Sequence, residues 1–226
     1  MDEIIQLFEE CEDFRHKSAI KSNLEFFDPP RGKNNFRFHH ELFLKKLENH
    51  QFGETTPTGE NLDAMITNNL STDEASSIYM YTHHNIYKNI NYLLRSNIKL
   101  HKDENAYIKL LNKGLDKLNS TNNAILYRDI SQPENGVEFA LDFYESKLNS
   151  VVQFNDYLSC HKDNRRISDE ETDFQFVIST SSNSNAKDIQ NITFIQIELE
   201  VLFKNGTKFK IDVVDRTQNQ IHITEI

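Results

Sequence analysis

The chain has few of the residues and segments that mark several common protein classes. Its 226 residues include two cysteines, too few for a disulfide scaffold and typical of free thiols in a reducing compartment. No apolar stretch approaches the ~20 residues of a membrane-spanning helix, and the acidic first residues do not resemble a secretory signal. We therefore expect no membrane span and a cytoplasmic location, in its own cell or in one into which it is delivered.

Basic runs and glycine are also scarce. Acidic residues outnumber basic ones 35 to 25, and no Lys/Arg run offsets this balance, which argues against nucleic acid as a partner. The six glycines form neither G-x-G-x-x-G nor G-x-x-x-x-G-K-S/T, which excludes Rossmann and P-loop nucleotide binding. His39-His40 and His83-His84 are adjacent pairs without accompanying ligands, so no metal site is predicted.

The first half of the chain has helical patterns. Residues 1–65 have the pattern of short helices broken by turns, which we expect to form an N-terminal helical segment. Ser71 followed by Glu74 is a capping-box signal, and it predicts a helix within residues 70–97. Apolar residues at helical spacing predict a further helix over 104–118.

From residue 124 onward the pattern changes to strands. Segments rich in β-branched and aromatic residues predict six of them: 124–130, 151–159, 174–180, 194–203, 208–214 and 220–226. Asn205-Gly206 predicts a hairpin turn between the fourth and fifth strands. Helices followed by antiparallel-leaning strands indicate an α+β fold rather than a doubly wound parallel sheet.

Two glutamates, Glu198 and Glu200, are the first candidates for chemistry. Residues two apart on a strand share a face, so both carboxylates would project to the same side. Taken alone, the pattern is equally that of an ordinary strand, in which Ile197, Leu199 and Val201 face the core and both glutamates face water.

The surrounding segments resemble arginine-specific mono-ADP-ribosyltransferases. "IELEVLFKNGTKFKI" resembles that family's E-x-E-V-L-F-x-x-G-T-x-F-x-I segment, and "AKDIQNITFIQIELEVLF" the stretch leading into it. "IYMYTHHNIYKNINYLLR" is similar to a family helix, and "LYRDI" to its Y-R-G strand. The resemblance implies an α+β ADP-ribosyltransferase fold, with two packed, mainly antiparallel sheets flanked by helices. It places the catalytic domain over residues 66–226, after the helical segment 1–65.

The family is named R-S-E for three strand-borne residues, and two serines compete for the middle position. In the family, the serine precedes E-x-E by a segment, a further strand and a loop. Only 18 residues, 180–197, separate Ser179 from Glu198, too few for the extra strand, whereas 38 separate Ser159 from Glu198. We assign the functional serine to Ser159, and strand and turn roles to Ser179 and its neighbours.

The resemblance implies NAD as co-substrate, no metal, and a target protein presenting an arginine as partner. Glu200 would stabilise positive charge developing on the ribose, and Ser159 would donate a hydrogen bond to Glu200. Glu198 would orient the acceptor guanidinium through charge-assisted hydrogen bonds. Arg128, whose planar donors match phosphate oxygens, would bind the NAD phosphates.

Several of these assignments have a structural alternative. Tyr81 and Asn91 match helix positions that line the NAD pocket in the family, but they could equally be core residues. Arg128 could form an ion pair with Asp129, and Ser159 could be a strand-end hydroxyl.

Two positions depart from the family pattern. Asp129 replaces the glycine whose backbone groups would hold the nicotinamide amide, and Ser159-Cys160-His161 replaces Ser-Thr-Ser.

Two functions therefore stay open. The first is an NAD-dependent, arginine-directed mono-ADP-ribosyltransferase acting as a toxin or effector. The alternative is a catalytically degenerate module of the same fold that binds NAD or a protein. Transfer to nucleic acid is disfavoured by the acidic charge.

Overall fold

A computed structural model describes residues 65–83, 86–95, 99–100, 102–130, 137–164, 174–193 and 199–226. The chain divides into two compact units, one of residues 1–118 with 191–195 and one of 119–190 with 196–226. The helices expected before residue 65 lie outside the described residues, so the division at 65/66 stays a prediction. No helix in the described part of the chain is long and apolar enough to cross a membrane.

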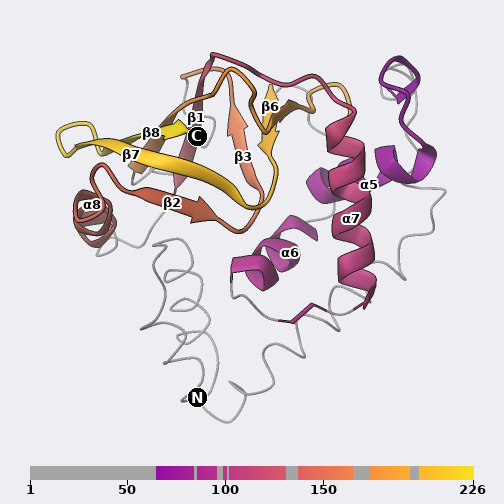
Figure 1. The fold of residues 1–226 in the computed structure, drawn as a ribbon, viewed down its shortest axis with the longest axis horizontal. Coiled ribbons are helices and arrows are strands. Elements are labelled where there is room, and N and C mark those ends of the chain that lie inside the picture. Colours follow the sequence, from indigo (N-terminus) through magenta and orange to yellow (C-terminus); the bar gives the residue numbers. More distant parts are fainter. Residues whose placement is uncertain are drawn as a thin grey trace, which may run out of the picture. The chain divides into compact units, whose positions relative to one another are not determined.

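The first unit contains α5 (Thr72–His83), α6 (Ile86–Arg95) and α7 (Lys102–Asp116), shown in Figure 1. The stretch 70–97, predicted as one helix, contains two elements, with residues 84–85 outside the described part. The predicted capping box is confirmed. The Ser71 backbone N–H donates to Glu74 Oε2 at 2.7 Å, and the Glu74 N–H donates to Ser71 Oγ at 3.2 Å.

Helices α5 and α7 pack closely because a glycine lies at their contact. A Cβ added at Gly114 would lie 3.2 Å from the Glu74 carbonyl oxygen and 3.2 Å from Ile78 Cδ1. The Tyr107 hydroxyl also donates to the Ser77 carbonyl at 2.8 Å in the buried space between the helices. The helix pair is thus held by close backbone approach and a buried hydrogen bond.

The described part of the second unit contains one helix and eight strands. Its elements are β1 (Ile125–Ile130), α8 (Val137–Glu145), β2 (Val151–Phe154), β3 (Leu158–His161), β4 (Phe174–Ser179), β5 (Ala186–Asp188), β6 (Glu200–Phe203), β7 (Thr207–Asp215) and β8 (Gln220–Glu225). The strands lie in the order β2-β7-β8-β4-β1-β3-β6-β5. Among the described strands, every neighbouring pair except the parallel β4 and β8 is antiparallel.

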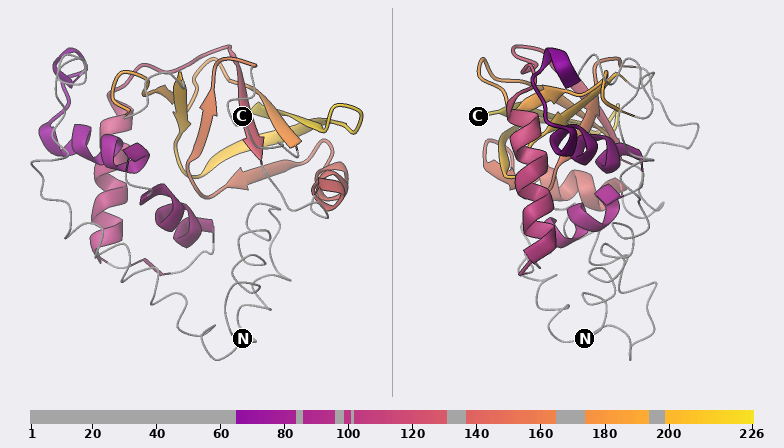
Figure 2. Two further views of the ribbon diagram at one scale, coloured as in Figure 1. Left: turned by 180° about the vertical axis from the view of Figure 1, so that it is seen from behind. Right: turned by 90° about the vertical axis from the view of Figure 1, so that its right-hand side faces the viewer.

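The strands form two regularly paired groups, β2-β7-β8-β4-β1 and β3-β6-β5. Strands β1 and β4 pair through six residues each, whereas β1 and β3 are joined by the single pair Tyr127 and His161. The two predicted sheets are therefore joined into one by a single residue pair. Figure 2 shows the strands from behind and from the side.

A chain of buried aromatic rings holds the two strand groups in one core. Phe203 of β6 contacts Phe209 of β7, with ring centroids 5.1 Å apart, and Phe209 contacts Phe154 of β2 at 5.2 Å. Phe154 contacts Phe176 of β4 at 5.8 Å, and Tyr144 of α8 contacts Phe176 at 5.3 Å. Ring edges and faces meet at angles that favour aromatic pairs.

Three sequence predictions about this unit need correction. The segment 151–159, predicted as one strand, contains β2 and the start of β3. The turn at Gly206 is present, with φ of +82°, but β6 and β7 do not pair with each other. Turn residues set a local reversal, whereas burial decides which strands pair. Helix α8 was not predicted, although Ala140, Leu141 and Tyr144 are buried at helical spacing.

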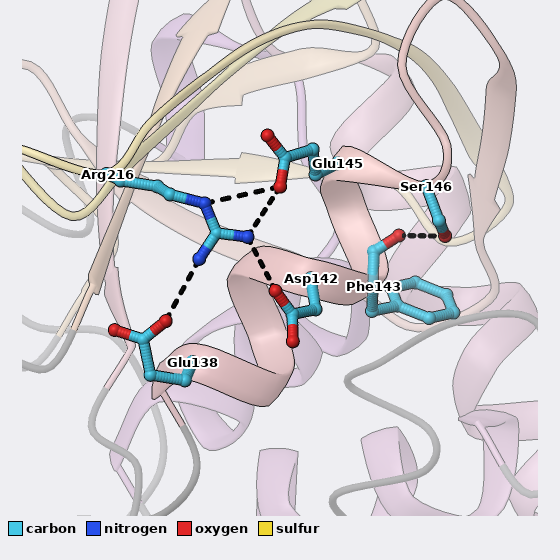
Figure 3. A network of polar contacts seen from close by, with 6 residues as sticks. All are labelled: Glu138, Asp142, Phe143, Glu145, Ser146 and Arg216. Carbon is cyan, nitrogen blue, oxygen red and sulfur yellow. Dashed lines mark hydrogen bonds and ion pairs between the residues drawn. The ribbon is translucent and has the colours of Figure 1, made fainter.

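Helix α8 is tied to the β7–β8 turn through one arginine (Figure 3). The Arg216 guanidinium contacts Glu138 at 2.9 Å, Asp142 at 2.5 Å and Glu145 at 2.5 Å. These acids occupy positions i, i+4 and i+7 of α8, so they line one face of the helix. The three carboxylates share one planar set of donors.

Candidate active site

Strands β3 and β6 bring Ser159 and Glu200 together. Ser159 is in register with Leu202 and His161 with Glu200, so Ser159 and Glu200 are diagonal neighbours on one face. The Ser159 hydroxyl donates to Glu200 Oε1 at 2.6 Å. Glu200 is only 8% exposed. A short hydrogen bond to a buried carboxylate holds that carboxylate in one orientation.

The start of β6 differs from the prediction for the acidic pair. The strand begins at Glu200, and Leu199 has a left-handed φ of +49°. The argument that both glutamates project to one side because they share a strand is therefore wrong, since a left-handed residue interrupts the alternation. Glu198 itself lies outside the described residues, so its position relative to Glu200 stays a prediction.

Arg128 lies on β1, the strand next to β3. It is in register with Phe176 of β4, so alternation directs it away from the side of β1 that bears Tyr127. Its Nε is buried, and among the described residues it has no hydrogen-bond partner. An unsatisfied buried donor costs about 1–3 kcal/mol, and more when charged, so this guanidinium is suited to an anionic ligand.

The Asp129 carboxylate does not pair with Arg128, the alternative that the sequence left open. Asp129 Oδ1 accepts a hydrogen bond from Gln175 Nε2 at 2.9 Å, and Oδ2 lies 3.4 Å from His161 Nε2. The His161 ring stacks on Tyr127, with centroids 6.1 Å apart. The sequence did not predict the contact between Asp129 and His161, although both residues depart from the family pattern.

Tyr81 and Asn91, the two predicted pocket residues of the helical unit, contact each other. Asn91 Nδ2 donates to the Tyr81 hydroxyl at 2.9 Å, and both residues are buried. The hydrogen bond joins α5 to α6, which agrees with either a core role or a pocket-lining role.

The serine-rich turn after β4 has a structural role. The Thr180 hydroxyl accepts a hydrogen bond from the Ala124 N–H at 2.8 Å, and the Ser181 N–H donates to Glu225 Oε2 at 3.1 Å. Strand β4, which ends at Ser179, lies between β8 and β1 and is not a neighbour of β6. The serine that contacts Glu200 is Ser159, as the spacing argument predicted.

The described residues contain no group of three or more His, Cys, Asp or Glu side chains that could hold a metal ion. The structure brings Glu200, Ser159, His161 and Asp129 to one face, whereas Arg128, with its buried unpaired donor, lies on the other face of β1. A carboxylate of this kind can stabilise a developing positive charge, and the guanidinium can bind phosphate.

Comparisons with known proteins show the family and the fold. The family model described as ADP-ribosyltransferase exoenzyme matches residues 57–226. The chain is similar to Plx2a, an ADP-ribosyltransferase toxin from Paenibacillus larvae (20% identity, 71% of this chain and 89% of that one, TM-score 0.59). It is also similar to the Clostridium limosum C3 exoenzyme (20% identity, 70% and 86%, TM-score 0.57).

A third structural likeness is to C3stau2 from S. aureus, solved with NAD (17% identity, 72% and 90%, TM-score 0.56). A search of curated protein sequences gives no match. At these identities the structural likenesses concern the fold alone, and they confirm the α+β fold predicted from the sequence.

Proposed function

The chain belongs to the ADP-ribosyltransferase exoenzyme family, and on that premise we propose that it transfers ADP-ribose from NAD to an arginine side chain of a target protein. The observation that carries the proposal is the 2.6 Å hydrogen bond from Ser159 to Glu200 on neighbouring strands. It supplies the oriented, buried carboxylate that cleavage of an N-glycosidic bond requires.

Glu200 acts at the ribose. The bond between ribose C1′ and the nicotinamide nitrogen breaks, its electron pair leaves with nicotinamide, and positive charge develops on the ribose. The Glu200 carboxylate stabilises that charge best if its position is set beforehand. Ser159 sets it, because its hydroxyl donates to Glu200 Oε1 at 2.6 Å.

Glu198 acts on the acceptor. A guanidinium is protonated at neutral pH and is a poor nucleophile until a base accepts one of its protons. A second carboxylate close to the ribose would orient the arginine by charge-assisted hydrogen bonds and take the proton as its nitrogen bonds to C1′. This role distinguishes transfer to arginine from hydrolysis of NAD, because water needs no such orientation.

Arg128 binds the dinucleotide. Its buried Nε, which has no partner in the described part of the chain, would donate to a phosphate oxygen of NAD. Asp129 follows it on the strand that would run beside the nicotinamide. Tyr81 and Asn91, joined by their 2.9 Å hydrogen bond, stay further candidates for NAD binding.

The target and its location follow from the family. Plx2a is described as a toxin, and we infer that this chain also acts as a toxin or effector on a protein in the cytosol of another cell. Water must be kept from the ribose for transfer to compete with hydrolysis, so some NAD hydrolysis is expected when no acceptor is present.

The test uses the full chain with labelled NAD, in the presence and absence of an arginine-containing acceptor. We expect Glu200→Gln to abolish both transfer and hydrolysis. Glu198→Gln should abolish transfer to arginine but retain hydrolysis. Glu138→Gln, a substitution of a glutamate whose side chain is 78% exposed on α8, is the matched control and should keep both activities.

Transfer by Glu200→Gln at the wild-type rate would contradict the site assignment. The alternative function, a degenerate binding module, rests on Asp129 and His161, which replace family residues. A wild-type chain that binds NAD in calorimetry but neither hydrolyses nor transfers it would favour that alternative.

A further inference from the structure

Two residues that depart from the family pattern lie against each other. Asp129 stands where the family has glycine, and His161 stands at the third position of Ser-Thr-Ser. Their side chains are 11% and 9% exposed, and His161 Nε2 lies 3.4 Å from Asp129 Oδ2. We propose that Asp129 and His161 form a coupled pair of positioning residues for Glu200. This proposal rests on the function proposed above.

The pair lies at the joint between the two strand groups. Tyr127 and His161 form the one registered pair between β1 and β3 in the described part of the chain. Asp129, two residues after Tyr127, shares a face of β1 with it and reaches His161 diagonally. The contact therefore connects the strand of the phosphate-binding Arg128 to the strand of Ser159.

The imidazole is held on one side and faces Asp129 on the other. His161 Nδ1 is in hydrogen-bond contact with the Asp163 carbonyl oxygen, which can only accept, so Nδ1 is the donor. Nε2 is buried and lies 3.4 Å from Asp129 Oδ2, and no hydrogen bond satisfies it in the described part of the chain. The Asp129 carboxylate is thus the charged group that Nε2 faces.

The carboxylate is itself held in place. Gln175 Nε2 donates to Asp129 Oδ1 at 2.9 Å, and Gln220 Nε2 donates to the Gln175 side-chain oxygen at 3.0 Å. This series of amides crosses β8, β4 and β1 and leaves Oδ2 directed at the imidazole. Asp129 is thus oriented before any ligand binds.

The imidazole lies across β3 and β6 from the catalytic carboxylate. His161 is the register partner of Glu200, and Ser159 lies two residues before it on the same face of β3. The side chains that face His161 in the described part of the chain include Asp129 and Tyr127 from β1 and Glu200 from β6. A ring held against Asp129 fixes this part of β3, and with it the Ser159 hydroxyl that donates to Glu200.

The experiment is a double-mutant cycle with Asp129→Asn and His161→Gln, assayed by NAD hydrolysis. Each single variant should lower kcat about tenfold, or about 1.4 kcal/mol in the barrier, with KM for NAD nearly unchanged. The double variant should be no worse than either single one, because the interaction is lost only once.

A matched control pair lies one position away. Lys162 Nζ contacts Asp188 Oδ2 at 2.6 Å, and both side chains are about one-third exposed. Lys162→Gln should keep the wild-type kcat. Asp129→Glu, which retains the carboxylate, should recover part of the activity lost in Asp129→Asn.

A spectroscopic measurement separates failure of this inference from failure of the proposed function. The nitrogen NMR shifts of the His161 ring should differ between the wild-type chain and Asp129→Asn. Identical shifts in the two chains would overturn the inference even in a chain without activity. An active wild type whose variants share its kcat would also overturn it, while leaving the proposed function in place.

Discussion

At the scale of single residues, the two serine candidates differ in their neighbours. Ser159 donates to a carboxylate on the adjacent strand β6, whereas Ser179 ends a strand whose neighbours are β1 and β8. The chemistry of both side chains is the same. What separates their roles is the distance along the chain, which places both β4 and β5 between Ser159 and β6 but β5 alone between Ser179 and β6 in the described part of the chain.

We predict that Ser159→Ala lowers kcat for NAD hydrolysis about 10- to 100-fold, since hydrogen bonds to charged groups contribute about 1.5–3 kcal/mol. KM should change little, because the hydroxyl orients Glu200 and is not expected to bind NAD itself. Steady-state kinetics measure both. Ser179→Ala is the matched control and should retain wild-type kcat, and equal losses in both variants would contradict the assignment.

At the scale of elements, the N-terminus of α5 carries a buried charge. Burial would raise the pKa of Glu74, but hydrogen bonds from Lys117, the Ser71 N–H and Lys113 outweigh it and lower the pKa from 4.5 to about 2. The two lysines lie on or just after α7, with Lys117 Nζ 2.6 Å from Glu74 Oε2. One carboxylate therefore both caps α5 and attaches it to the next helix.

Glu74 should make stability depend on pH. Because folding lowers its pKa, the ionised carboxylate stabilises the folded chain above about pH 4.5, and this contribution is lost as pH falls towards 2. We expect Glu74→Gln to lower the midpoint of urea unfolding at pH 7. The difference in midpoint between the variant and the wild type should narrow as the pH falls from about 5 to about 2.5.

The matched control for Glu74→Gln is Asp73→Asn, an exposed residue in the same helical turn. Asp73→Asn should lower the urea midpoint at pH 7 only slightly, because Asp73 is not part of the capping box. A difference between Glu74→Gln and wild type that stays constant over the whole pH range would contradict the ion-pair explanation.

The attachment of α8 is also electrostatic. Hydrogen bonds from Arg216 to Glu145 and Asp142 raise the pKa of the guanidinium further, so it stays charged at any accessible pH. The group is exposed, so salt should screen these contacts. We expect Arg216→Ala to lower the melting temperature at low salt, and the loss to shrink at about 1 M salt, where the Debye length is about 3 Å.

Two comparisons sharpen the test on α8. Arg216→Lys keeps the charge but loses the planar set of donors that contacts three carboxylates, so its melting temperature should be intermediate. Lys208→Ala removes a charge from an exposed position on β7 and should have a smaller effect. A salt-independent loss in Arg216→Ala would point to packing rather than charge.

At the scale of the whole molecule, the net charge of −10 is the dominant feature. A field of this sign attracts basic surfaces and repels acidic ones, and it changes association rates more than the chemical step. Under the proposed function, the acceptor arginine should therefore be presented best by a basic surface.

We predict faster labelling of an arginine peptide with basic flanking residues than of one with acidic flanking residues. The ratio of initial rates should fall as ionic strength rises, because salt screens the attraction. NAD hydrolysis without acceptor, measured at each salt concentration, corrects for effects on NAD binding. Equal rates for the two peptides at low salt would show that the field does not select the acceptor.

The spacing of residues along the sequence predicted more of the fold and of the candidate site than residue type alone did. The order of helices and strands, the capping box of Ser71 and Glu74, and the choice of Ser159 all depend on periodicity or separation along the chain, which a single sequence contains. The family segments added the fold. They also point to Glu200 and Arg128 as candidate site residues.

The tertiary structure decided which elements lie side by side. It separated β6 from β7 in spite of their turn, began β6 at Glu200 after the left-handed Leu199, and brought Asp129 against His161. Strand partners and cross-strand contacts depend on how buried faces are shared by segments distant in the sequence. No local pattern contains that information, so the pairing of two unusual residues appeared only in the folded chain.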